Sequence, residues 1–197
     1  MDAYRKFLSA LVERYDGDGK DDMPGLKMPV KYYEILNEPE MRSPDLTFFK
    51  GSAQDYADLL AASNDAIKET CADCKVVQAG AAGNDEQFLS FWKDVFSKGG
   101  GDYFDIANIH YIAHGDKSTL NVAPFKSLMA GYGIEKPVWV TEAEYAPGDT
   151  VTASFKGALS AGASKIFFTR FEIGKKGPPA PGVYSEEYRG LTAACPG

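Results

Sequence analysis

The chain has 197 residues and a formal net charge of -7, with 44% hydrophobic and 25% charged residues. A chain of this length and composition can bury a core of its own, so we expect one globular domain over residues 1–197. Because the Lys and Arg residues form no cluster, nucleic acid and anionic membrane surfaces are excluded as partners, and a neutral substrate is favoured. No apolar stretch of about 18 residues occurs, which argues against a membrane-spanning helix.

Short apolar strands alternate with amphipathic helices along the chain. Apolar residues at helical spacing predict helices over 4–15, 56–67, 88–96, 122–129 and 151–161. Runs rich in β-branched and aromatic residues predict strands over 30–36, 75–79, 104–111, 137–141 and 165–169. Ser52 is expected to cap the second helix, and Asn84 with Gln87 has the spacing of a capping box for the third.

This alternation predicts an α/β fold with a parallel sheet and outer helices, arranged either as a doubly wound sheet or as a (β/α)8 barrel. A doubly wound sheet often has a glycine-rich first turn, and no GxGxxG follows any predicted strand. In a barrel, functional residues gather at the C-terminal ends of several strands. Polar pairs occupy these positions here: Asn37 and Glu38, His110 and Tyr111, Glu142 and Glu144, Arg170 and Glu172. The barrel is therefore favoured.

Two glutamates at strand ends carry the functional prediction. Glycoside hydrolysis needs a proton donor for the leaving oxygen and a second carboxylate at the anomeric carbon. Glu38 lies in YYEILNEP at residues 32–39, and Glu142 closes KPVWVTE at residues 136–142. These segments resemble the two signature strands of the clan A glycoside hydrolases, nearest to the xylosidase, iduronidase and cellulase-like members. The interval between the two glutamates has room for three strand and helix repeats, as the resemblance requires.

The resemblance implies a retaining glycosidase built on a partial (β/α)8 barrel, whose parallel strands correspond to strands four to eight. In that clan the glutamate of Asn-Glu-Pro is the general acid/base and the glutamate closing the seventh strand is the nucleophile, which gives these roles to Glu38 and Glu142. Asn37 matches the asparagine that bonds the 2-hydroxyl of the substrate, and His110 and Tyr111 match residues that line the sugar site. The implied ligand is a carbohydrate, with no cofactor and no metal.

The sequence departs from the family pattern because it starts in what corresponds to the third helix, without the earlier strands and their arginine near the nucleophile. Strands four and seven would lie about 14 Å apart in a flat sheet, whereas a retaining pair needs carboxyl groups about 5 to 5.5 Å apart. The sheet must therefore curve. An incomplete barrel exposes two strand edges and an apolar inner face, so we expect a homo-oligomer or a missing N-terminal barrel segment.

Alternative interpretations of the same residues stay open at this point. Glu38 and Glu142 could be solvated carboxylates, and His110 could be a core histidine bonded to backbone. Trp92 and Trp139 are both expected in the core. At the level of function, the alternative to an active glycosidase is a noncatalytic carbohydrate-binding or scaffold remnant of such a barrel.

Two further motifs bear on metal or redox chemistry. Cys71 and Cys74 form a CxxC that follows a helix instead of opening one, which favours a buried pair or a local disulfide over a reactive thiol. The loop over 16–27 has alternating carboxylates, but it places lysine at the fifth and twelfth loop positions, where an EF-hand needs acidic or amide ligands. A solvated acidic turn and a nonstandard cation site remain the alternatives for this loop.

Overall fold

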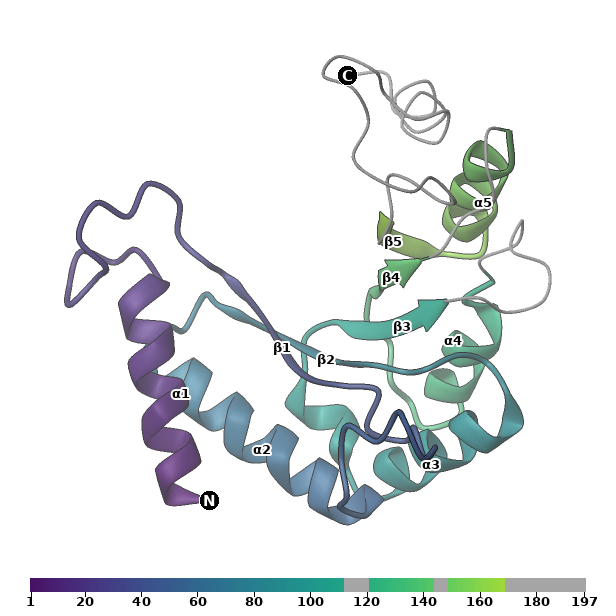
Figure 1. Cartoon of the computed structure of the whole chain (residues 1–197), viewed down its shortest axis with the longest axis horizontal. Coiled ribbons are helices and arrows are strands. Elements are labelled where there is room, and N and C mark those ends of the chain that lie inside the picture. Colours follow the sequence, from purple (N-terminus) through teal and green to yellow (C-terminus); the bar gives the residue numbers. More distant parts are fainter. Residues whose placement is uncertain (112–120, 144–148, 169–197) are drawn as a thin grey trace.

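The computed structural model describes residues 1–111, 121–143 and 149–168, and within them the fold consists of alternating helices and parallel strands (Figure 1). In chain order the elements are α1 (Asp2–Tyr15), β1 (Tyr32–Asn37), α2 (Ala53–Thr70), β2 (Lys75–Gly80), α3 (Glu86–Ser97), the 3-10 helix η1 (Gly100–Tyr103), β3 (Ala107–Tyr111), α4 (Ala123–Ala130), β4 (Val138–Ala143), α5 (Asp149–Ser160) and β5 (Ala163–Phe168). No described helix has both the length and the apolar character that crossing a lipid bilayer demands.

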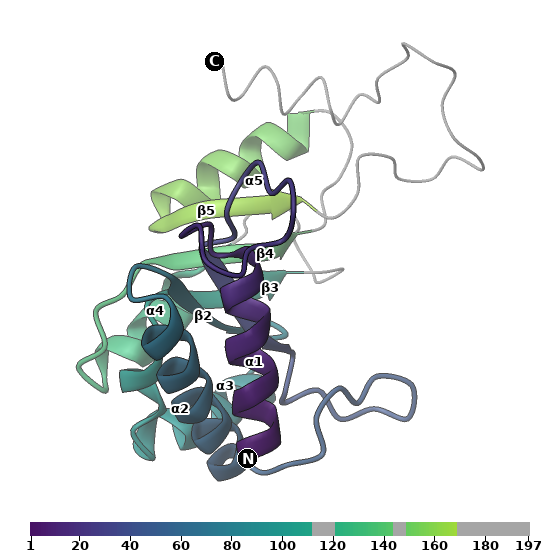
Figure 2. The same ribbon diagram turned by 90° about the vertical axis from the view of Figure 1, so that its left-hand side faces the viewer.

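The strands follow one another across the sheet in chain order. β1 pairs with β2, β3 with β4, and β4 with β5, all in parallel. Two parallel bridges, Val77 with Ile106 and Ala81 with Ile109, join β2 to the chain around β3. Helices lie along the outer side of the curved sheet (Figure 1), with α1 beside α2 and α5 beside β5 (Figure 2). This is the arrangement of part of a (β/α)8 barrel.

Helix α2 is fixed at its start and at its contact with the sheet. The Ser52 hydroxyl accepts a hydrogen bond from the Asp55 amide at 3.2 Å, and the Asp55 carboxylate accepts one from the Ser52 amide at 2.7 Å, which confirms the predicted cap. The fully buried Tyr56 hydroxyl donates to the Ile35 carbonyl at 3.2 Å and accepts from the Ala79 amide at 2.8 Å. One side chain therefore ties α2 to both β1 and β2.

An aromatic cluster fills the space between the helices and the outer face of the sheet. Trp92 of α3 is fully buried, as predicted. Its ring lies 5.4 Å from that of Tyr56, 5.9 Å from Phe125 of α4 and 6.0 Å from Phe96. Burial of several aromatic rings contributes strongly to stability, so this cluster is the centre that joins α2, α3 and α4.

Among the described residues, no helix covers the opposite, inner face of the sheet (Figure 1). Along β1, buried residues alternate with exposed ones, as expected for a strand with one covered face. The exposed set contributes to a pocket of about 330 Å³ lined by Tyr32, Glu34, Val77, Trp139, Thr141 and Phe167. The prediction that Trp139 belongs to the core is wrong, because its ring is only half-buried on this inner face, with the Lys165 ammonium 4.4 Å from its centroid.

Most predicted elements agree with the structure to within about three residues at each end. The strand predicted over 104–111 begins only at Ala107, because the Asp105 carboxylate turns aside to accept from Lys68 and from the Val76 amide, each at 2.8 Å. The predicted Asn84 cap is also wrong. Helix α3 begins after Asp85, and the Asn84 amide donates to the Asn121 carbonyl at 2.6 Å.

Candidate functional site

Glu38 lies in a strained turn just after the end of β1. Its backbone is left-handed, with φ of 37°, and that of Leu36 has φ of 76°. Non-glycine residues adopt this region rarely, at a cost of about 1 to 3 kcal/mol, and such residues cluster at functional sites. The Met41 amide donates to the Glu38 carbonyl at 3.0 Å and closes the turn. The fold thus holds Glu38, whose exposed fraction is 8%, in one defined position.

His110 of β3 is the centre of the site. Its buried ring places Nδ1 3.0 Å from Glu38 Oε1 and Nε2 3.0 Å from Thr141 Oγ1. Glu34 Oε1 lies 3.7 Å from Nε2, and Glu142 Oε2 lies 3.9 Å from Nδ1. His110 is therefore a buried histidine, but its ring nitrogens face side chains of β1, of the turn after it and of β4.

Gly80, the last residue of β2, makes room for this ring. A Cβ at Gly80 would lie 2.0 Å from His110 Nε2 and 2.1 Å from Cδ2, which is closer than such atoms can approach. Any side chain there would displace the imidazole from Glu38 and Thr141. The glycine is thus required by the close approach of β3's histidine to the end of β2.

The carboxylates around His110 determine its charge. Burial of the ring lowers its pKa, but the carboxylates of Glu34, Glu38 and Glu142 beside the ring nitrogens outweigh burial and raise the pKa of His110 to about 9. At neutral pH the ring is therefore an imidazolium. Its positive charge offsets the repulsion among acidic groups that share a small volume.

The two predicted catalytic glutamates converge on this ring. One side-chain oxygen each of Glu38 and Glu142, and one ring nitrogen of His110, all lie within 4.8 Å of one another. Glu38 follows β1 and Glu142 belongs to β4, three strands further across the sheet, so only a curved sheet brings them together. The curvature that the sequence analysis required is present. The separation is compatible with that of a retaining carboxylate pair, about 5 to 5.5 Å.

The other predicted residues lie at the same end of the strands. Asn37 is half-buried, ends β1 and is in register with Gly80. The backbone of Tyr111 is in register with Ala143 of β4, but its side chain falls outside the described residues. The same holds for the polar positions Glu144, Arg170 and Glu172.

Three polar residues around His110 were missed in the sequence. The buried Asn108 donates from Nδ2 to Thr141 Oγ1 at 2.6 Å and accepts from the Thr141 amide at 3.1 Å. Thr141 Oγ1 lies 3.4 Å from Glu34 Oε1. Together these bonds hold the partner of His110 Nε2. Glu34 had a detectable signal, because the strand period of two places it on the same face as Glu38.

The similarity of this chain to known proteins lies in its fold. Neither a family model nor a curated protein matches the sequence. Among solved structures, BuGH86 in complex with neoagarooctaose is 15% identical, has a TM-score of 0.64 and is matched over 96% of this chain and 38% of its own. A glucosidase from Croceicoccus marinus is 17% identical with a TM-score of 0.60, over 85% of this chain and 38% of that one. An endo-1,4-beta-mannanase from Rhizomucor miehei is 16% identical with a TM-score of 0.56, over 87% and 53%.

The chain has the fold of a partial (β/α) barrel. It spans between 38% and 53% of the length of these three proteins. On this barrel, Glu38, His110 and Glu142 stand at the C-terminal ends of strands, which is the end where barrel enzymes carry their functional residues.

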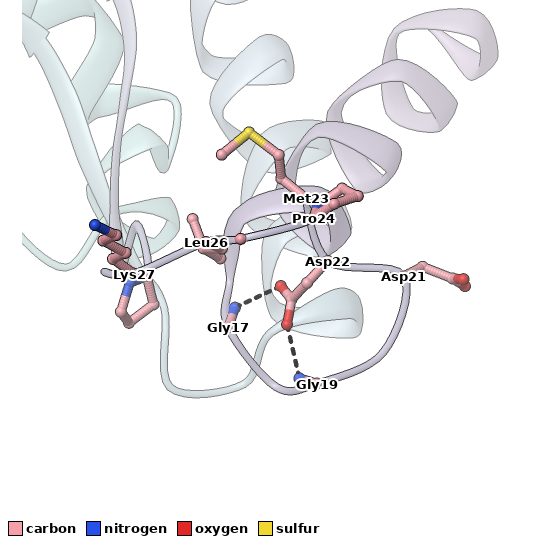
Figure 3. Close-up of a pocket in the computed structure, with 10 residues that line it drawn as sticks. Gly17, Gly19, Asp21, Asp22, Met23, Pro24, Leu26 and Lys27 are labelled. Carbon is pink, nitrogen blue, oxygen red and sulfur yellow. Dashed lines mark hydrogen bonds between the residues drawn. The ribbon is translucent and has the colours of Figure 1, made fainter.

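The two motifs that suggested metal or redox chemistry lie apart from this end. Cys71 and Cys74 are joined by a disulfide after α2, in agreement with the local pairing expected from the sequence. In the acidic loop, the Asp22 carboxylate accepts from the amides of Gly17 at 2.9 Å and Gly19 at 2.8 Å (Figure 3). Side-chain oxygens of Asp16, Asp18 and Asp22 lie within 4.8 Å of one another. The same holds for one side-chain atom each of Glu38, His110 and Glu142. Both groups contain side chains that can bind divalent cations. The hydrogen bonds from the Gly17 and Gly19 backbone amides to the Asp22 carboxylate stabilise the acidic turn from within the loop.

Proposed function

We propose that this chain is the part of a retaining glycoside hydrolase that carries both reacting carboxylates, with Glu38 as general acid/base and Glu142 as nucleophile. The observation that carries the proposal is the convergence of these two side chains, from β1's end and from β4, on the one imidazole of His110 within 4.8 Å. The neighbouring folds, which include proteins described as a glucosidase and a mannanase, support it by analogy of architecture.

In the first step, the Glu142 carboxylate attacks the anomeric carbon while Glu38 protonates the glycosidic oxygen. The bond between carbon and leaving oxygen breaks as the bond to Glu142 forms, through a transition state with positive charge on the ring. In the second step, Glu38 takes a proton from water, whose oxygen attacks the same carbon and releases Glu142. Both carboxylates end the cycle as they began it.

His110 contributes to these steps through its contact with Glu38. His110 Nδ1 lies 3.0 Å from Glu38 Oε1, close enough to exchange a proton with that carboxyl in either step. For the first step we assign the proton to the pair as a whole. It passes from the pair through Glu38 to the leaving oxygen, and the proton that Glu38 takes from water in the second step restores the pair.

Covalent trapping tests the proposal. A panel of 2-deoxy-2-fluoro glycosides of glucose, mannose, xylose and galactose, followed by peptide mass spectrometry, is expected to label Glu142. Glu142→Gln and Glu38→Gln should each lower aryl glycoside turnover by at least about a hundredfold, whereas Glu135→Gln, at an exposed site, should leave it unchanged. Equal turnover in all four proteins would refute the mechanism.

A second function, carbohydrate binding without hydrolysis, is favoured by a different observation. Among the described residues, β1 and β5 each pair on one side only, and the chain spans at most 53% of the length of the three compared proteins. Part of a sugar cleft could then be absent from this chain. Oligosaccharide binding by calorimetry, with no covalent label from any of the fluoro-sugars, would select this function over the first.

A further inference from the structure

We propose that Glu40 is a positioning residue, which holds the turn after β1 so that Glu38 stays against His110. This inference rests on the proposed function, in which Glu38 is the general acid/base. Glu40 lies two residues beyond Glu38, separated from it by Pro39, and matches no part of the Asn-Glu-Pro motif.

Glu40 is a carboxylate buried behind the site. Its exposed fraction is 7%. Oε1 accepts hydrogen bonds from the Ala82 amide at 2.6 Å and from the Trp92 indole at 2.9 Å. Oε2 is buried and has no hydrogen-bond partner among the described residues. Burying a carboxyl group with one oxygen unpaired is costly, and an apolar side chain of similar size would fill the space more cheaply.

The partners of Glu40 are themselves buried in the core. Trp92 is fully buried, with its ring 5.4 Å from Tyr56 of α2 and 5.7 Å from Phe91. Ala82 follows the end of β2 and is also buried. Through two hydrogen bonds, Glu40 therefore anchors the turn after β1 to α3 and to the chain after β2.

This anchor acts on the strained backbone of Glu38. The left-handed conformation at Glu38 is unfavourable by itself and persists only where its surroundings impose it. Pro39 has a fixed φ and transmits the position of Glu40 to Glu38. Arg42 adds a second restraint by donating to the Pro39 carbonyl at 2.6 Å and to the Gly51 carbonyl at 2.9 Å. Without the hydrogen bonds of Glu40, we expect the turn to relax and the Glu38 carboxylate to move away from His110 Nδ1.

A purely structural role for Glu40 predicts a different outcome from a positioning role. Loss of a buried hydrogen bond lowers stability in either case. Only a positioning role also changes the contact between Glu38 and His110. The titration of His110 reports this contact, because its ring faces Glu34 and Glu38 from β1 and the turn after it, and Glu142 from β4.

The test is an NMR titration of the imidazole of His110 in Trp92→Phe and Glu40→Gln, with His114, the only other histidine of the chain, as internal reference. Trp92→Phe keeps an aromatic ring and removes the indole donor, so it decides the matter even where Glu40→Gln does not fold. From a wild-type pKa of about 9, both variants should bring the pKa of His110 down by about one pH unit or more towards its ordinary value.

The matched control is Glu86→Gln, at an exposed glutamate of α3 that pairs with Lys93 at 2.7 Å. This substitution should leave the pKa of His110 unchanged.

A double-substitution cycle separates positioning from a direct effect of the Glu40 charge. In the Glu38→Gln background, where the contact is already weakened, Glu40→Gln and Trp92→Phe should move the His110 titration no further. The proposal would be overturned if the folded single variants kept the wild-type pKa of His110. It would also be overturned if Glu40→Gln and Trp92→Phe shifted that pKa equally in the wild-type and Glu38→Gln backgrounds. Because this readout needs no turnover, a failure of fluoro-sugar labelling would count against the proposed function and leave this result intact.

Discussion

At the scale of single residues, the site depends on the charge of His110. Three carboxylates, those of Glu34, Glu38 and Glu142, lie within 3.9 Å of its ring nitrogens. Their mutual repulsion in a partly buried volume would separate them without a cation among them. The imidazolium therefore stabilises the arrangement that the proposed reaction uses.

A pH dependence of stability follows from this charge. The folded pKa of about 9 lies above the ordinary value of 6.5, so the contribution of His110 is complete below about pH 6.5 and is lost as pH rises through about 9. For this buried ring the loss amounts to about 3 kcal/mol at most. Urea unfolding of the wild type and of His110→Gln between about pH 6 and pH 10 measures it. The two curves should approach each other as pH rises, and parallel curves would contradict the prediction.

The positions of Glu38 and Glu142 at strand ends were predictable, whereas the residues that support the candidate site were not. Glu38 and Glu142 stood out because each follows a short apolar run. Gly80 and Thr141 gave no such signal, because their importance comes from β2 and β4 lying beside β3, which only the folded sheet establishes.

At the scale of elements, α2 has a defined start whose energy can be measured. Removal of the Ser52 hydroxyl deletes the bond from the Asp55 amide at 3.2 Å and half of the capping box. We expect Ser52→Ala to lower the free energy of unfolding by about 1 kcal/mol, as for other N-caps. Ser97→Ala, at the exposed last residue of α3, is the control and should cost less. Denaturant midpoints compare the two, and an equal effect would place the loss outside the cap.

The two predicted caps had different outcomes for a physical reason. Ser52 and Asp55 satisfy each other locally, so the sequence spacing alone sufficed. Asn84 instead bonds the Asn121 carbonyl, 37 residues away in the chain. Trp92 and Trp139 differ in the same way, since the first packs against its own helix layer and the second faces the open side of the sheet. The local cap was thus predictable from spacing, whereas the surroundings of Asn84 and Trp139 depend on distant segments and were not.

At the scale of the whole molecule, the strands of the described residues have the curvature of a barrel and form part of its circle. Within the described residues the order of strands is β1 to β5, with one unpaired edge at each end. The inner face between these edges carries exposed aromatic side chains, including Tyr32 and Phe167, whose rings flank Trp139 at 5.0 Å and 6.0 Å. Unpaired strands beside an apolar face ordinarily pair with another chain or another segment.

We therefore expect the isolated chain to self-associate through its inner face. Light scattering coupled to size-exclusion chromatography should give a mass that increases with concentration. Phe167→Glu places a charge on this face, where the phenylalanine is 45% exposed, and should restore the monomer mass. Phe7→Glu makes the same change at a residue of α1 that is 64% exposed, and should leave association unchanged. A constant monomer mass in the wild type would contradict the expectation, and equal effects of both substitutions would place the contact on another surface.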